Sequence, residues 1–218
     1  MSSPALHLAT LYETDAGGAL TTTREPAGTL APMFVLVRSP TISAWGIRAG
    51  VPDALAALAR DEPPVRALHD LPKHVDRYRT LGTTEWFGPA FGFPDAIAPP
   101  SDVVPVEDER ELNANFRGWV PGEIAAGRAP VMGIVVDGHP VSVCFCARRS
   151  HAAAEAGVET APAFRGRGYA ARVTAAWALA IRASGRIPLY STSWTNTASL
   201  AVARKLGLVA YASTWSIA

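Results

Sequence analysis

The sequence predicts an α+β protein in which strands are flanked by helices, with an additional α/β part at the N-terminal end. From about residue 105 onward, short β-rich runs alternate with two longer runs of helical periodicity. Asp137-Gly138 separates two of the β-rich runs, which is typical of a tight hairpin turn. Before residue 100 the runs are shorter and contain no recognisable motif. We therefore divide the chain into residues 1–100 and residues 101–218.

The composition is that of an ordinary globular protein. The 218 residues are 49% apolar and 18% charged, which suits one large or two small domains. The start lacks a basic region followed by a long apolar stretch, and the run AAWALAI is too short to cross a bilayer. We therefore expect a cytoplasmic protein with no signal peptide and no membrane contact.

The cysteines and histidines do not predict a metal site. Cys144 and Cys146 form a single C-x-C pair, without a second pair to complete a zinc site. The five histidines show no ligand spacing. We interpret both cysteines as small core residues in a reducing compartment.

The charge is divided unevenly along the chain. Residues 160–218 contain seven basic and no acidic residues, whereas residues 1–159 contain 13 basic and 19 acidic residues. This asymmetry suggests an anionic partner for the C-terminal third. The alternative is two oppositely charged halves that pack together, because charge alone does not separate the two cases.

The N-terminal part contains three runs that we predict to be strands: LHLATLY, MFVLVRS and SAWGIRA. Residues 52–62 predict a helix that begins at Pro52-Asp53, and a shorter helix is expected around residues 74–81. The Pro and Gly content of residues 84–105 excludes a long regular element, and its second half connects the two parts. Aromatic side chains in this segment either anchor a loop on the core or line a pocket: Trp86, Phe87, Phe91 and Phe93.

The C-terminal part predicts a regular succession of elements. These are a helix over 108–127 broken near Pro121, a hairpin over 130–149, a strand over 155–161, a helix over 165–185, a strand over 187–194, a helix over 196–207 and a last strand over 208–218. Four apolar residues at four-residue steps form one stripe on the 165–185 helix: Tyr169, Val173, Trp177 and Ile181.

The stretch RGRG, residues 165–168, stands where this helix is expected to start. A helix start leaves four backbone N–H groups without internal partners, and the helix dipole adds positive charge there. Gly166 and Gly168 allow a bulky anion to approach these donors, and Arg165 and Arg167 add guanidinium groups suited to phosphate oxygens. The sequence therefore predicts a pyrophosphate site.

Two phosphate-binding motifs fit this stretch. The first, G-x-G-x-x-A over residues 166–171, is the dinucleotide fingerprint, but it lacks the acidic residue expected about 20 residues later. The second, (Gln/Arg)-x-x-G-x-(Gly/Ala), is met by Arg165, Gly168 and Ala170. With the later N-x-x-S at Asn196 and Ser199 and the K-L-G at 205–207, the order of elements over residues 105–218 resembles the GNAT superfamily of acyl-CoA-dependent N-acetyltransferases.

This resemblance implies a mixed, splayed sheet in which the strands VET and YSTSW part around the pantetheine arm of acetyl-CoA. It also implies that backbone groups of Val158 and Thr160 bind the pantetheine, and that Asn196 and Ser199 contact the cofactor. The residues implied to hold the pyrophosphate are Arg165, Gly166, Arg167, Gly168, Tyr169 and Ala170. Residues 1–100 then form either a degenerate GNAT-like half or an unrelated substrate cap.

Acyl transfer to an amine needs a base, and the strand at 155–161 offers two carboxylates. Glu155 and Glu159 lie four residues apart and so point to the same face. Glu155 matches a strand carboxylate that many members of the family use as a base. Glu159 has apolar neighbours that would raise its pKa, and we prefer it slightly. The alternative for either residue is a surface or ion-paired carboxylate.

The leaving thiolate often receives a proton from a tyrosine in the last helix of these enzymes, but that position holds Ala203. Tyr190 is our candidate replacement, with Ser191, Ser193, Tyr211 or water as alternatives. We also expect four residues near the strand opening to contact the substrate: Ser191, Thr192, Ser193 and Trp194. They could equally form a capping run before the next helix.

We therefore expect an N-acyltransferase that moves an acetyl or other short acyl group from CoA to an amine of a small molecule or peptide, without a metal. A non-catalytic acyl-CoA-binding sensor is the alternative. Nucleic-acid binding is not expected, because Tyr169 and Trp177 fall on the apolar stripe rather than among exposed bases. A homodimer is one possible assembly, and the sequence leaves the acceptor and the oligomeric state open.

Overall fold

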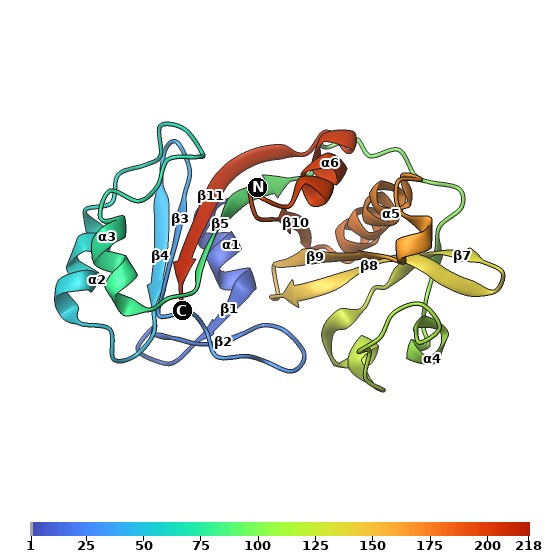
Figure 1. The fold of residues 1–218 in the computed structure, drawn as a ribbon, viewed down its shortest axis with the longest axis horizontal. Coiled ribbons are helices and arrows are strands. Elements are labelled where there is room, and N and C mark those ends of the chain that lie inside the picture. Colours follow the sequence, from blue (N-terminus) through green and yellow to red (C-terminus); the bar gives the residue numbers. More distant parts are fainter. Residues whose placement is uncertain (1) are drawn as a thin grey trace.

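A computed structural model describes residues 2–218, and a nine-stranded mixed sheet runs across the molecule (Figure 1). Its strand order is β4-β3-β11-β5-β10-β9-β8-β7-β6. In chain order these strands are β3 (Phe34–Arg38), β4 (Ser43–Ile47), β5 (Glu85–Gly92), β6 (Val104–Pro105), β7 (Met132–Val136), β8 (His139–Arg149), β9 (Ala153–Thr160), β10 (Ile187–Ser191) and β11 (Val209–Ile217). The mixed sheet with flanking helices confirms the predicted fold class.

The chain begins with a helix, not with the strand predicted over LHLATLY. Ser3 caps α1 (Pro4–Leu11) by accepting a hydrogen bond from the Leu6 amide at 3.2 Å, and Pro4 occupies the first helical position. The helix packs against β3, β4, β8 and β9 and buries His7 and Thr10. A small separate ribbon follows, made of β1 (Tyr12–Thr14) and β2 (Leu20–Thr23).

The predictions for MFVLVRS and SAWGIRA as strands are confirmed by β3 and β4. The predicted helices at 52–62 and 74–81 appear as α2 (Asp53–Arg60) and as α3 (Val75–Tyr78) followed by a short turn of 3₁₀ helix. Both helices lie beside β3 and β4, at the left end of the molecule in Figure 1.

The expectation that Pro and Gly exclude a long element from residues 84–105 is wrong. β5 spans eight residues and pairs with β11 on one side and β10 on the other. Pro89 is tolerated because the hydrogen-bonding side of its backbone faces Thr192, which lies beyond the end of β10. The N–H group that proline lacks is therefore not needed to pair two strands at this position. Gly88 is needed because a β-carbon at this position would collide with the Thr192 carbonyl oxygen.

The predicted helix over 108–127 is mostly absent. Only α4 (Glu109–Leu112) forms, where Asp108 caps the Arg110 amide at 2.8 Å, and a wide helical turn follows over Ile124–Arg128. The chain between them turns at Gly118 and Gly122, whose φ angles are +108° and +87°. These left-handed positions interrupt the helix that the residue composition favours.

The predicted hairpin is confirmed. Val136 pairs with His139 across a turn in which Asp137 and Gly138 have φ angles of +51° and +80°. β8 then pairs antiparallel with β9 from Ser142↔Thr160 to Arg149↔Ala154.

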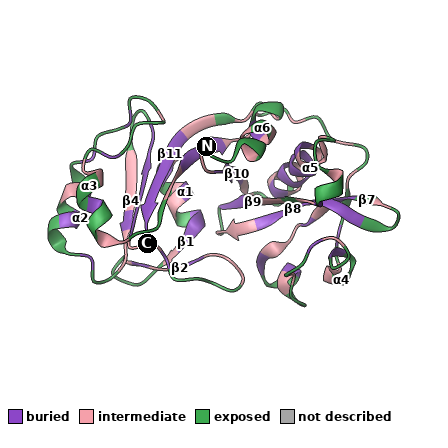
Figure 2. Ribbon diagram, in the orientation of Figure 1, coloured by how far each residue is buried: buried purple, intermediate pink, exposed green. Residues whose placement is uncertain are grey.

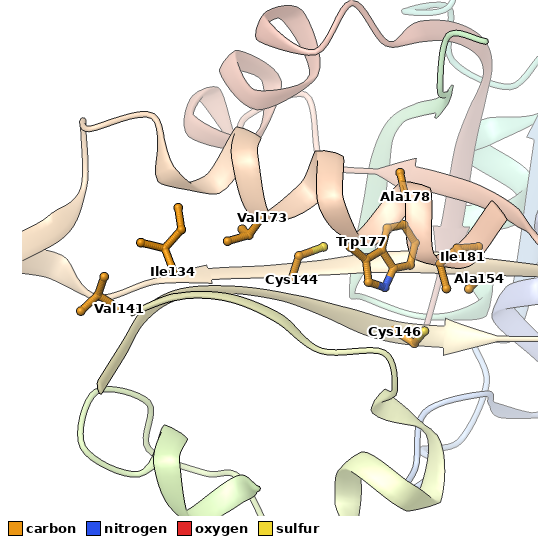
Figure 3. Packing of buried hydrophobic residues seen from close by; sticks show 9 residues of the cluster. All are labelled: Ile134, Val141, Cys144, Cys146, Ala154, Val173, Trp177, Ala178 and Ile181. Atoms are coloured by element: carbon orange, nitrogen blue, oxygen red, sulfur yellow. The ribbon is translucent and has the colours of Figure 1, made fainter. Parts of the chain in front are cut away.

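The helix predicted over 165–185 is α5 (Tyr169–Ala183), which starts four residues later than expected. Its apolar stripe faces β7, β8 and β9 (Figure 3), and Val173, Trp177 and Ile181 are fully buried there. Cys144 and Cys146 belong to the same core and are both free, which confirms their predicted role as core residues. The last helix is α6 (Thr197–Lys205). Figure 2 shows buried residues along β11 and α5 and exposed residues in many of the connections.

Candidate functional site

The sheet opens between β9 and β10. The two strands run parallel and pair only at Ile187↔Ala153, Pro188↔Ala154 and Leu189↔Glu155. Beyond Glu155, β9 continues along β8 to Thr160, while β10 follows β5 to Ser191. One edge of β9 therefore faces an opening instead of a neighbouring strand, which leaves backbone groups there available to a ligand.

A groove of about 950 Å³ follows this opening. The predicted site residues among its lining are Val158, Glu159, Thr160, Arg165, Gly166, Gly168, Tyr169, Ala170, Tyr190, Ser191, Asn196 and Ser199. Other predicted residues are not part of its lining: Glu155, Arg167, Ser193 and Trp194. Thr192, a predicted substrate contact, also lines the groove. The lining that sequence reasoning did not select includes Asn115, Phe116, Arg117 and Lys205.

The start of α5 forms one end of the groove. Gly166 and Gly168 both have φ angles of +77°, and Gly168 is the N-cap residue of the helix. The first N–H groups of α5 therefore point out of the helix beside residues without side chains. Arg165 donates a hydrogen bond from Nε to the Thr160 carbonyl at 3.2 Å, and Arg167 bonds the Ala163 carbonyl and lies over the Phe164 ring.

Lys205, at the end of α6, reaches across to the same place. Its Nζ lies so close to Gly168 that a β-carbon on residue 168 would collide with it. The side chain makes no ion pair within residues 2–218. An ammonium group beside a helix N-terminus is electrostatically unfavourable until an anion joins it. The K-L-G signature was the sequence signal that could have identified this residue.

The β10–α6 wall carries a pair of hydroxyl groups. The Oη of Tyr190 and the Oγ of Ser199 lie 2.6 Å apart, and Asn196 caps α6 by accepting from the Ser199 amide at 3.0 Å. Burial raises the pKa of Tyr190 to about 12, against the opposing effect of the Ser199 hydrogen bond, so the phenol keeps its proton at neutral pH. Ala203 packs against Tyr190 in a buried apolar cluster beside these hydroxyl groups.

The two candidate carboxylates have different surroundings. Glu159 lies on the exposed groove wall, and its pKa is raised because of partial desolvation, with Glu123 adding repulsion and Arg128 opposing it. Glu155 is 3% exposed. Its carboxylate pairs with Arg148 at 3.0 Å and accepts a hydrogen bond from the Ser191 hydroxyl.

Ser193 and Trp194 lie in the connection between β10 and α6. Ser193 pairs with the Thr195 hydroxyl at 2.8 Å, and the Trp194 ring stacks on His69 at 3.6 Å between centroids. The structure therefore separates them from Ser191, which lines the groove.

Within residues 2–218, no cluster of three or more metal-ligating side chains occurs. None of the described helices has the length and apolar character that a membrane span requires.

The fold is therefore a mixed α+β sheet that parts between two parallel strands, beside a glycine turn that begins a helix. Residues 125–215 match the family model described as GNAT acetyltransferase, so this part of the chain is similar to that family. This confirms the resemblance drawn from the sequence. Comparison with curated proteins gives no match.

Solved structures share the fold. A GNAT-family acetyltransferase from Novosphingobium aromaticivorans is 23% identical with a TM-score of 0.51, over 61% of this chain and 64% of its own, so this chain spans less than two thirds of that protein. A GNAT-family acetyltransferase from Colwellia psychrerythraea is 12% identical with a TM-score of 0.51, over 94% of this chain and 80% of its own. A tandem GNAT protein from the clavulanic acid biosynthesis pathway is 15% identical with a TM-score of 0.50, over 81% and 74%.

Proposed function

We propose that this protein is a GNAT-type N-acyltransferase that transfers an acetyl or other short acyl group from CoA to an amine of a small molecule or peptide. The observation that carries the proposal is the groove that connects the strand opening after Glu155 to the start of α5. Such a groove suits a long ligand with an anionic end. The match of residues 125–215 to the GNAT acetyltransferase family model supports acyl transfer as the reaction class.

The residues present fit the diphosphate of CoA. Gly166 and Gly168 leave the first N–H groups of α5 open to a bulky anion, and Lys205 and Arg165 add positive charge at the same end. The free edge of β9 at Val158 and Thr160 would receive the pantetheine arm. Asn196, the N-cap residue of α6, and Ser199, in the first turn of α6, would line the opposite wall.

The reaction would join the acceptor nitrogen to the acyl carbon while the carbon–sulfur bond breaks. The amine must lose a proton, and Glu159 is our candidate base because it lies on the groove wall with a raised pKa. The thiolate leaves with its electron pair. Tyr190 would donate a hydrogen bond to it, because the phenol is protonated at neutral pH and lines the groove.

Binding and turnover test this proposal separately. Calorimetry with acetyl-CoA, CoA and NAD should show micromolar or tighter binding of the first two and none of NAD. A panel of aminoglycosides, amino acids, polyamines and peptides would then be screened for thiol release. Preferential binding of NAD would reject the proposal. If acetyl-CoA binds but no amine of the panel causes release of the CoA thiol, the result would favour the alternative, a non-catalytic acyl-CoA-binding sensor.

A further inference from the structure

A chain of polar side chains connects the N-terminal segment to the strand opening. The Arg148 guanidinium in β8 donates from Nη2 to Glu25 at 2.6 Å and from Nη1 to Glu155 at 3.0 Å. The Glu155 carboxylate in turn accepts the hydroxyl proton of Ser191, which lines the groove. Residues 24–28 therefore lie two side chains away from the candidate site.

The cluster around Glu155 carries one excess negative charge. The charged members are Glu25, Arg148 and Glu155, and the other titratable groups that face them are His7 of α1, Tyr12 of β1 and Tyr211 of β11. Burial lowers the pKa of His7, despite the nearby Glu155, so this ring is neutral. Burial raises the pKa of both tyrosines, so they are neutral as well. Two carboxylates thus share one guanidinium.

Arg148 also fixes the direction of the Glu155 carboxylate. A buried charge is costly unless it is paired, and the Glu155 side chain is only 4% exposed. Its two oxygens are occupied by different partners, Arg148 and Ser191. Because the Ser191 proton is donated to Glu155, the lone pairs of the Ser191 oxygen are left to accept a hydrogen bond from the groove.

We infer that Glu25, acting through Arg148, positions the Glu155–Ser191 pair as an anchor for the amine group of the acceptor. This inference rests on the proposed function. An amine that arrives protonated is attracted by the excess negative charge and donates an N–H to the Ser191 oxygen. Ser191 would contact the acceptor, whereas Glu155, Arg148 and Glu25 are positioning residues. The N-terminal segment then completes the acceptor end of the groove.

A thiol placed at the anchor tests this inference without requiring turnover. Ser191→Cys would be alkylated with iodoacetamide, while Cys144 and Cys146 are fully buried. Adding Glu25→Gln removes one negative charge near the thiol and should speed alkylation about threefold or more, because half a unit of pKa changes the thiolate fraction by that factor. Glu25→Asp, which keeps the charge, should restore the slow rate.

The matched control is Glu13→Gln. Glu13 lies in the same N-terminal segment and pairs with Arg24 at 2.6 Å, away from Arg148. In the Ser191→Cys background this control should leave the alkylation rate unchanged. Equal rates with and without Glu25→Gln would overturn the inference, as would an equal acceleration by Glu13→Gln.

Turnover provides a second readout with the best amine of the panel. Glu25→Gln should raise the KM for that amine about fivefold, leave acetyl-CoA affinity unchanged, and have no further effect in a Ser191→Ala background. Additive effects in the double variant would reject a role through Ser191. If the unmodified protein transfers to no amine, the proposed function fails, and the alkylation rates still decide whether Glu25 controls the charge at residue 191.

Discussion

The ammonium group of Lys205 occupies the space that a β-carbon on Gly168 would need. The two residues come from different helices, since Gly168 caps α5 and Lys205 ends α6. This contact places the lysine at the end of the groove where we propose that the diphosphate binds, because the bare backbone at 168 leaves room for the lysine side chain. Two predictions separate these contributions.

Gly168→Ala should reduce acetyl-CoA affinity at least tenfold, as measured by calorimetry. An alanine with a φ of +77° costs about 1–2 kcal/mol of stability, and its β-carbon would also displace Lys205. Gly166→Ala is the matched comparison, since it has the same φ angle but open space around its β-carbon. We expect a similar loss of stability there and a smaller loss of affinity. Equal losses of affinity would mean that the displacement of Lys205 is unimportant.

Lys205→Gln should weaken acetyl-CoA binding about tenfold, or about 1.4 kcal/mol, and reduce the dependence of binding on salt. The reason is that this ammonium makes no ion pair among residues 2–218 and lies at the end of the groove proposed to hold the diphosphate. Arg204→Gln removes an exposed neighbouring charge outside the groove lining and serves as the control. Identical dissociation constants for the two variants across a salt titration would argue against a direct contact.

Most of the C-terminal fold could be predicted from the sequence because its signals are local. The Asp137-Gly138 turn and the apolar stripe through Val173 and Trp177 each depend on residues close in the chain. The same holds for the glycines that begin α5. The pyrophosphate site was predicted from these glycines and the neighbouring arginines. Lys205 belongs to the K-L-G signature, but it was not selected for the site because its contact with Gly168 is long-range.

The features that could not be predicted from the sequence also have physical reasons. β5 contains Gly88 and Pro89, which discourage a strand in isolation, and it forms only because β10 and β11 flank it. The Glu25–Arg148 contact joins residues 123 positions apart, so no local pattern indicates it. The boundary at residue 100 stays a prediction, since one sheet contains strands from both sides of it.

Glu159→Gln tests how the stability of the protein depends on pH through this carboxylate of the groove wall. The pKa of Glu159 is raised by partial desolvation above the ordinary value of 4.5, so the folded protein holds this proton more tightly than the unfolded chain. Glu159 therefore lowers stability as the pH rises from 4.5 through the raised pKa. The variant should match the unmodified Tm well below pH 4.5 and exceed it slightly near neutrality.

The same variant should lower kcat at least about 100-fold if Glu159 is the base, without changing acetyl-CoA affinity. In the unmodified enzyme, activity should fall as the pH drops through the raised pKa, because the protonated carboxyl cannot accept a proton. Glu107→Gln, at an exposed position outside the groove, is the control for both measurements. A kcat–pH profile that is the same in both variants would remove Glu159 from the mechanism.

Gly88→Ala should destabilise the protein by more than about 2 kcal/mol in urea unfolding, because its β-carbon would collide with the Thr192 carbonyl oxygen. Gly92→Ala in the same strand is the comparison, since its β-carbon would lie 3.1 Å from the Ser2 hydroxyl, which belongs to a side chain that can move. Thr192 lines the groove, so any relaxation of β5 should also change acetyl-CoA affinity in the Gly88 variant. Equal stability of the two variants would show that the connection after β10 yields easily, and that β5 does not fix the wall of the groove.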